Sequence, residues 1–187
     1  MKKLNLGCGS KIKDGYINLD KYNTFNPDIV HDLEEFPYPF EDNCVDQILL
    51  SHVLEHLGSN SSVFNNIMKE LYRICKDGSE IEILVPHPRN DDFLSDPTHV
   101  RPITDTLLSL YDRELNLIWK KEDAANSQLA LIHNVNFKII NKTLFLTKEY
   151  EKKFKDKSIS REQLDQDIKH LNNVVKENYF KLKVIKN

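Results

Sequence analysis

The stretch LNLGCGSKIKDGYINLD, from Leu4 to Asp20, decides the fold. A short apolar run leads into Gly7 and Gly9, and a second apolar run ends in the carboxylate of Asp20. Glycines let the backbone turn tightly and let a ligand reach main-chain N–H groups that a side chain would screen. Ligands of parallel sheets bind beyond the carboxyl ends of the strands. We therefore expect Asp20 to lie beside the glycine loop, placed to accept hydrogen bonds from ribose hydroxyls.

The rest of the chain alternates apolar runs with helical or irregular segments, which predicts an α/β fold with a mostly parallel sheet. Strands are expected at Lys3–Leu6, Tyr16–Asp20, Asp28–Asp32, Val45–Ser51, Glu80–Pro86, Phe137–Thr147 and in YFKLKVIKN at 179–187. Helices are expected within 61–78 with Gly78 as the stop, then at 104–119, 124–133 and 160–171. The charged run KEYEKKFKDK at 148–157 is expected to be a solvated connection.

Composition limits the classes of protein to consider. The 187 residues predict a single domain spanning 1–187, with 40% hydrophobic residues to form its core. A net charge of -3 and the lack of a basic face argue against binding to nucleic acid through phosphates. No apolar stretch is long enough for a signal peptide or a membrane span. Cys8, Cys44 and Cys75 are far apart and form no C-x-x-C pair, which predicts a reduced, cytoplasmic protein.

A nicotinamide dinucleotide fits the glycine loop poorly. The G-x-G-x-x-G pattern needs a third glycine at position 12, where Ile12 stands. Asp20 follows Gly9 by 11 residues, whereas the ribose-binding acid of that pattern follows at about 20. The segment SKIKDG is also too short for the usual crossover helix. A ligand with a ribose but no phosphates fits this loop better.

Four motifs in order resemble those of class I S-adenosylmethionine (SAM) dependent methyltransferases. LNLGCGS resembles their first motif, GYINLD their ribose-binding motif, and HDLEEFPYPFEDNCVDQILLSHVLEHL the next two. The resemblance covers Leu4–Leu57 and, more loosely, Ile81–Pro86. It implies a Rossmann-like, doubly wound, mostly parallel sheet with an antiparallel last strand. It also implies a helical insertion after strand five, at about 87–133, that covers the acceptor site.

The resemblance also implies a set of cofactor-binding residues. Gly7, Cys8 and Gly9 would line the methionine part of SAM, and Asp20 would hold the ribose hydroxyls. The other expected contacts are Asp32 and Leu33 at the adenine, Ser51 and His52 at the methyl-transfer site, and Asn5 and Leu6 before the loop. Two features depart from the family. Asn5 stands where an acid commonly holds the methionine amine, and the first crossover helix is missing.

The segment PHPRNDDFLSDPTHVRPIT at 86–104 is the expected acceptor-binding stretch, because it follows strand five on the carboxyl edge. His99 is the first candidate for a general base and His52 the second, since imidazole titrates near neutral pH. The candidates for binding the acceptor are His87, Arg89, Asp96 and Arg101. Two alternatives remain open: a salt-bridged surface loop, or a divalent-ion site built from Asp91, Asp92, Asp96 and His99. No metal is included in the predicted site.

These observations predict transfer of the SAM methyl group to a small-molecule acceptor, a hydroxyl of a sugar, lipid-linked or metabolite substrate. Strand four ends in SHV and not in an N-P-P-Y type of sequence, which argues against methylation of nucleobases. The chain is expected to be a monomer or a homodimer. One alternative is a non-catalytic protein that binds SAM or a nucleotide. Another is a zinc hydrolase, because HVLEH matches H-x-x-E-H with His52, Glu55 and His56.

Overall fold

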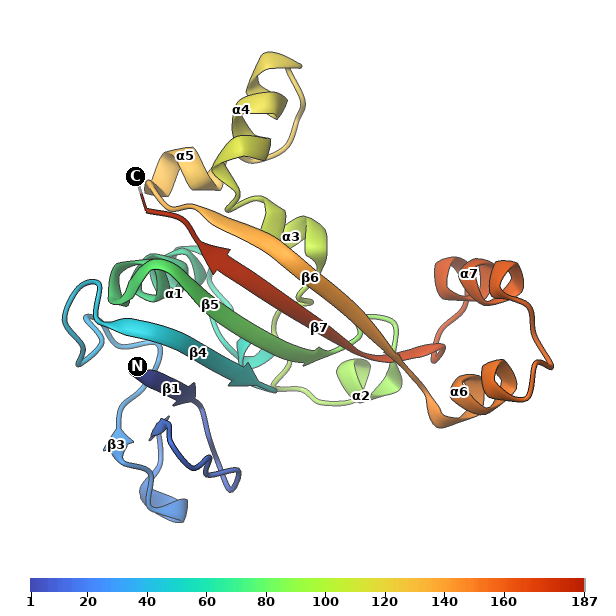
Figure 1. Ribbon diagram of the computed structural model, residues 1–187, viewed down its shortest axis with the longest axis horizontal. Helices are drawn as coiled ribbons and strands as arrows, with labels where there is room; N and C mark the ends of the chain where they lie inside the picture. The colour runs from blue at the N-terminus through green and yellow to red at the C-terminus, as the bar shows by residue number, and fades with distance from the viewer. Residues whose placement is uncertain (187) are drawn as a thin grey trace.

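The computed structural model describes residues 1–186, so the last residue of the expected terminal strand, Asn187, lies outside it. Seven strands form one sheet in the order β3-β2-β1-β4-β5-β7-β6 (Figure 1). They are β1 (Lys3–Leu6), β2 (Ile17–Asp20), β3 (Ile29–Val30), β4 (Val45–Ser51), β5 (Cys75–Pro86), β6 (Phe137–Leu146) and β7 (Val175–Val184). Strands β1 to β5 pair in parallel, and β7 runs antiparallel to both β5 and β6. The Rossmann-like sheet with an antiparallel last strand is thus confirmed.

The helical insertion expected after strand five is present. The α-helices are α1 (Ser61–Ile74), α2 (Asp91–Leu94), α3 (Asp105–Ser109), α4 (Arg113–Lys121), α5 (Leu129–His133), α6 (Lys148–Lys155) and α7 (Arg161–His170). Two 3-10 turns, η1 (Asn23–Phe25) and η2 (Leu54–His56), complete the structure. In residues 1–186 we find no helix that combines the length and the apolar character needed to cross a bilayer.

Three local expectations are wrong. The helix expected over 104–119 is divided into α3 and α4, because the side chain of Asp112 accepts a hydrogen bond from Leu115 N and begins a new helix. The run at 148–157 contains helix α6, which pairs Lys153 with Glu149 four residues earlier. Helix α1 ends at Ile74, because β5 already pairs with β4 from its first residue.

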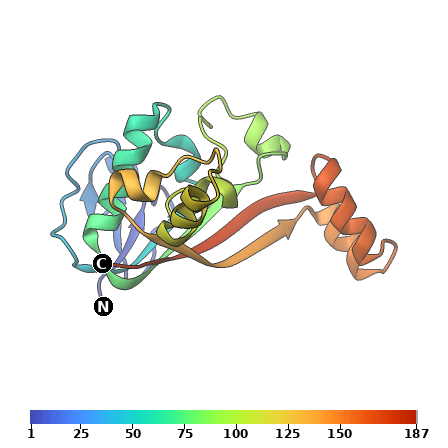
Figure 2. The same ribbon diagram turned by 90° about the horizontal axis from the view of Figure 1, so that it is seen from above.

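Helices α1 and α3 to α5 gather on one face of the sheet, whereas α6 and α7 lie beyond the end of the β6–β7 pair (Figures 1 and 2). Figure 2 shows α1 and α3 to α5 on the same side of the strands, where Leu50 and Ile83 are fully buried. Most of the side chains that alternate with these residues along β4 and β5, and so point to the other face, are polar, although Leu49 and Leu84 are not. There Lys181 Nζ lies 2.9 Å from Glu80 Oε2, and Gln47 Nε2 donates to Glu82 Oε1 at 2.9 Å. This face is therefore open to water, in contrast to a sheet with helices on both sides.

Two buried amides hold the connection between β1 and β2, which has no helix. Asn18 Oδ1 accepts from Asn5 Nδ2 at 2.9 Å and from Lys13 N at 2.8 Å. Asn18 Nδ2 donates to Tyr16 O at 3.1 Å and to Asp28 Oδ2 at 3.1 Å. Since a short irregular segment makes few main-chain hydrogen bonds of its own, these side chains supply the partners that its buried groups need.

Replacing Asn18 with alanine should lower the free energy of unfolding by about 2–4 kcal/mol, because several buried polar groups lose their partners at once. Urea unfolding followed by circular dichroism measures the change. The matched control is Asn66→Ala, at an exposed position within α1, which should alter the free energy by less than about 0.5 kcal/mol. Equal destabilisation by the two variants would contradict the role assigned to Asn18.

Candidate functional site

The glycine loop and Asp20 lie side by side, as the sequence predicts. Asp20 Oδ2 accepts a hydrogen bond from Gly9 N at 2.8 Å, and Asp20 Oδ1 accepts one from Tyr22 N at 2.9 Å. Cys8, between the two glycines, is buried. Its pKa is raised, first by burial and then by the negative charge of Asp20, so that it remains a neutral thiol. The loop therefore presents backbone groups and one carboxylate at the carboxyl edge of the sheet.

The two glycines of the loop serve different purposes. Gly7 has a φ of +67°, and a Cβ at this position would lie 2.6 Å from Val53 Cγ2. Gly9 has a φ of +49°, but a Cβ here would meet nothing within 4 Å among residues 1–186 beyond its own chain neighbours. Gly7 thus permits close packing of the loop on the segment after β4. Gly9 keeps the space above the loop open for a ligand.

Only some of the other expected cofactor residues line a cavity. Asn5, Gly7, Cys8 and Ser51 line a cavity of about 260 Å³, together with Leu49 and with Lys11, Ile12 and Lys13 of the connection. Leu6 and Leu33 are buried. Asp32 lies outside this lining and pairs with Lys21 Nζ at 2.6 Å. Burial raises the pKa of Asp32, but the hydrogen bonds from Lys21 and from Glu34 N outweigh it and hold the pKa below its usual value.

His52 and His99, the two candidate bases, line one cavity of about 370 Å³. Its other lining residues are Lys11, Pro86, Asp92, Lys176 and Glu177. His52 follows β4 with a φ of +57°, and its Nε2 lies 3.4 Å from Glu177 Oε1. His99 Nδ1 donates to Phe93 O at 2.9 Å, which leaves its Nε2 as the nitrogen with a lone pair. Lys11 lines both this cavity and the smaller one beside the loop, so the two adjoin.

The four expected acceptor-binding residues lie outside this cavity. Arg89 donates to Ile168 O at 2.8 Å and to Lys169 O, and so caps the end of α7. His87 lines a separate cavity with Arg89, and its pKa is lowered by burial and then by the charges of Arg89 and Lys142.

Asp96 and Arg101 also have structural partners. Asp96 Oδ1 accepts from Thr98 N at 2.8 Å and from Thr98 Oγ1 at 2.6 Å. Arg101 donates to Gly58 O at 2.6 Å and lies over the ring of Phe64, with Cζ 4.6 Å from the ring centroid. These contacts hold the 86–104 segment against the rest of the fold.

The HVLEH stretch does not form the zinc-hydrolase arrangement. That arrangement needs His52 and His56 on one face of a helix, but His52 adopts a left-handed conformation and His56 ends the 3-10 turn η2. The ring of His52 faces Glu177, whereas His56 Nδ1 lies 2.9 Å from Thr98 Oγ1. The interpretation based on a helical pair of histidines is therefore wrong.

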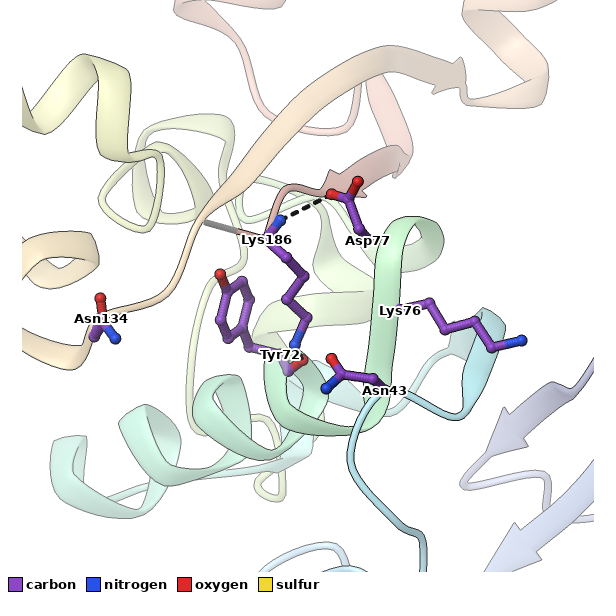
Figure 3. Close-up of a pocket in the computed structure, with 6 residues that line it drawn as sticks. All are labelled: Asn43, Tyr72, Lys76, Asp77, Asn134 and Lys186. Carbon is purple, nitrogen blue, oxygen red and sulfur yellow. Dashed lines mark hydrogen bonds between the residues drawn. The ribbon is translucent and has the colours of Figure 1, made fainter.

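A larger cavity, of about 510 Å³, lies far from the glycine loop (Figure 3). Its walls come from Asn43, Tyr72, Lys76, Asp77, Asn134 and Lys186. Asn43, Lys76 and Asp77 lie at the amino ends of β4 and β5, where a parallel sheet does not bind its ligands. Lys186 closes over Tyr72, with Nζ 4.0 Å from the ring centroid. We therefore place the functional site at the two adjoining cavities on the carboxyl edge.

Comparison with known proteins finds methyltransferases. Residues 8–83 match the methyltransferase domain family, and no curated protein matches the chain. A solved SAM-dependent methyltransferase from Archaeoglobus fulgidus is similar over 97% of this chain and 85% of its own, with 19% identity and a TM-score of 0.64. A second one, from Mesorhizobium loti, aligns with 97% of this chain and 90% of its own length, with 14% identity and a TM-score of 0.53.

A third solved structure is phosphoethanolamine N-methyltransferase 2 from Haemonchus contortus in complex with SAM. It aligns with 100% of this chain and 50% of its own length, with 13% identity and a TM-score of 0.53. The expected resemblance is confirmed. The chain has the Rossmann-like fold of class I SAM-dependent methyltransferases, and the segment from the glycine loop to β5 matches the methyltransferase domain.

Several residues of the site were not expected from the sequence. Lys11 was assigned only to a short connection, and Lys176 and Glu177 precede the segment that was expected to form the last strand. Lys176 and Glu177 reach the cavity because β7 inserts beside β5, so that Glu177 pairs with Pro86 at the carboxyl edge. The alternation of apolar residues and lysines predicts a strand here, but not its neighbour in the sheet.

Alanine at Gly7 should cost about 3 kcal/mol of stability, because it combines a strained backbone with a clash against Val53. Alanine at Gly9 should cost about 1 kcal/mol, because only the backbone strain applies. Thermal unfolding of both variants measures this difference. If Gly9→Ala were the more destabilising of the two, the close packing of Gly7 on Val53 could not be the dominant constraint.

Proposed function

We propose that this protein binds SAM at the glycine loop and transfers its methyl group to a small-molecule acceptor. The observation that carries the proposal is the hydrogen bond between Gly9 N and Asp20 Oδ2, at 2.8 Å, beside a cavity that adjoins a second cavity with two imidazoles. The fold and the matched methyltransferase domain support the same activity.

Asp20 suits the ribose of the cofactor. Each of its two oxygens accepts one main-chain hydrogen bond, and a carboxylate offers about four acceptor positions. About two positions therefore remain for a pair of vicinal hydroxyls. The open space above Gly9 fits a ligand that lies against the loop. Asp32 would accept from the adenine amine, in competition with its ion pair to Lys21.

The acceptor would bind in the cavity between His52 and His99. SAM supplies an electrophilic methyl group, so the protein must align an attacking oxygen and remove its proton. His99 is the first candidate for this step, because its Nδ1–H is held by Phe93 O and its Nε2 keeps a lone pair. His52 is the second, with its ring held by Glu177. A hydroxyl of a sugar, lipid-linked or metabolite substrate fits this chemistry.

The alternative function is binding of SAM or a nucleotide without catalysis, and one observation favours it. Asn5 replaces the acid that commonly holds the methionine amine in this family. Its amide nitrogen already donates to Lys11 O at 2.9 Å and to Asn18 Oδ1 at 2.9 Å. Asn5 therefore has no free donor directed at the cofactor, and in any case adds no negative charge to the site.

Titration calorimetry with S-adenosylhomocysteine, the product form of the cofactor, tests the binding site. Asp20→Ala should weaken binding at least about tenfold, or about 1.4 kcal/mol, because the ribose hydroxyls lose a charged acceptor. The matched control is Asp14→Ala, an exposed acid in the same connection, which should leave the affinity unchanged. Unchanged affinity in a folded Asp20→Ala protein would refute the site.

Transfer itself is tested by incubating the protein with SAM and a panel of small hydroxyl acceptors, and measuring S-adenosylhomocysteine release. With an accepted substrate, replacing the operative imidazole should lower kcat by about 10²–10⁴-fold, while S-adenosylhomocysteine still binds. The variants are His99→Ala and His52→Ala. Tight cofactor binding with no release for any acceptor would instead support the non-catalytic function.

A further inference from the structure

Three side chains with metal-binding atoms converge beside the acceptor cavity: Glu55, His56 and His99. One ligand atom from each lies within 4.8 Å of the others, and this is the one group of at least three His, Cys, Asp or Glu side chains to meet in this way among residues 1–186. Glu55 and His56 belong to η2, whereas His99 belongs to the segment between α2 and α3. Main-chain bonds from Val100 N and Arg101 N to Glu55 O fix the two segments together.

The carboxylate of Glu55 has no hydrogen-bonding partner among the described residues. The side chain is fully buried, and neither Oε1 nor Oε2 accepts a hydrogen bond. The closest basic group, His52 Nδ1, is 3.5 Å from Oε1, which is longer than a normal hydrogen bond. A buried carboxylate without a partner is costly unless a cation compensates it. Within the described part of the chain, both oxygens of Glu55 are therefore free of hydrogen-bond donors and available as ligands for a cation.

The two imidazoles are oriented as metal ligands usually are. His56 Nδ1 donates to Thr98 Oγ1 at 2.9 Å, and the Thr98 hydroxyl donates in turn to Asp96 Oδ1 at 2.6 Å. His99 Nδ1 donates to Phe93 O at 2.9 Å. In each ring the Nδ1–H is thus fixed by an acceptor, which leaves Nε2 with its lone pair, as in most metal-bound histidines. The two rings are in contact, with centroids 4.6 Å apart.

We propose that Glu55, His56 and His99 form a binding site for a divalent transition-metal ion, Zn²⁺ being the best fit. Two imidazoles and one carboxylate are a common zinc ligand set, and they leave a fourth position open. Mg²⁺ and Ca²⁺ fit less well, because they prefer oxygen ligands. Tetrahedral zinc sets its ligand atoms about 3.4 Å apart, so ligand atoms that lie up to 4.8 Å apart need to close by at most about 1.4 Å.

The site differs from the H-x-x-E-H arrangement, in which His52 and His56 bind the metal and Glu55 is the general base. Here His99 takes the place of His52, and Glu55 is itself a ligand. His99 also lines the acceptor cavity, which gives an ion access from solvent. Zinc and a proton cannot share Nε2 of His99. In the zinc-loaded protein the proton acceptor of the proposed methyl transfer is therefore His52. The zinc site itself does not depend on that proposed activity.

The test is a titration of the metal-free protein with Zn²⁺ alone, in competition with a chromogenic chelator. We expect one ion per chain, and Co²⁺ in its place should give the visible absorption of a four-coordinate site. Glu55→Gln and His99→Ala should each weaken zinc binding by about 100-fold or more, and Thr98→Val by about tenfold. His52→Gln should weaken binding less than His99→Ala does, because His52 lies beside Glu55 but is not a ligand. The matched control is His170→Ala, at an exposed position at the end of α7.

Thermal unfolding with and without Zn²⁺ distinguishes a variant that has lost zinc binding from one that fails to fold. Zinc should raise the Tm of the wild type and of His170→Ala, because it binds only the folded state, but not the Tm of Glu55→Gln. Glu55→Gln preserves the shape of the buried side chain, so its metal-free form should remain folded. The proposal is overturned if the wild type binds no zinc, if folded Glu55→Gln or His99→Ala binds it as tightly as the wild type, or if His170→Ala loses binding equally.

Discussion

The site depends on the hydrogen bonds of Asn18, which hold the connection between β1 and β2. Parallel strands are usually joined by a crossover of a dozen or more residues that contains a helix. Here β1 and β2 are joined by only the residues from Gly7 to Tyr16. The amides of Asn18 and Asn5 satisfy the buried groups of this connection. As a result β2 pairs in parallel with β1, and Asp20 at the end of β2 lies beside Gly9.

The short connection also explains why one face of the sheet is open. A helix after β1 would cover that face, but here only the connection itself lies against it, near Asn5 and Leu49. The strands carry polar side chains on this side, among them the Lys181–Glu80 ion pair. Water can solvate these polar side chains. Lys11 and Lys13 therefore form part of the wall of the cavity beside the glycine loop, in place of a helix.

The acceptor cavity combines segments that are far apart in the sequence. His52 comes from the end of β4, His99 from the insertion and Glu177 from the beginning of β7. The left-handed conformation of His52 directs the chain from β4 into η2, which buries Glu55 beneath the histidines. The same turn thus places an imidazole in the cavity and a carboxylate behind it. Charged groups in such partly buried surroundings are frequent at functional sites.

Much of the insertion has a structural role that sequence patterns could not reveal. Arg89 is in a polar loop on the functional edge, which made it a candidate for binding an acceptor. In the structure it caps α7, a helix that lies about eighty residues further along the chain. Arg101 likewise holds Gly58 and covers Phe64. The sequence shows that these side chains are polar, but their partners are set by contacts between distant segments.

The sequence alone determined the parallel strands, helix α1 and the pairing of the glycine loop with Asp20. Those features depend on local periodicity and on the fixed direction of parallel strands, so they can be recognised from residue order. Only the tertiary structure decided that Glu177 reaches the acceptor cavity, that Arg89 is occupied, and that Glu55, His56 and His99 converge. These groupings arise from the packing of β7 and the insertion against β4 and η2. No local sequence pattern specifies the distances between side chains that are remote in the chain.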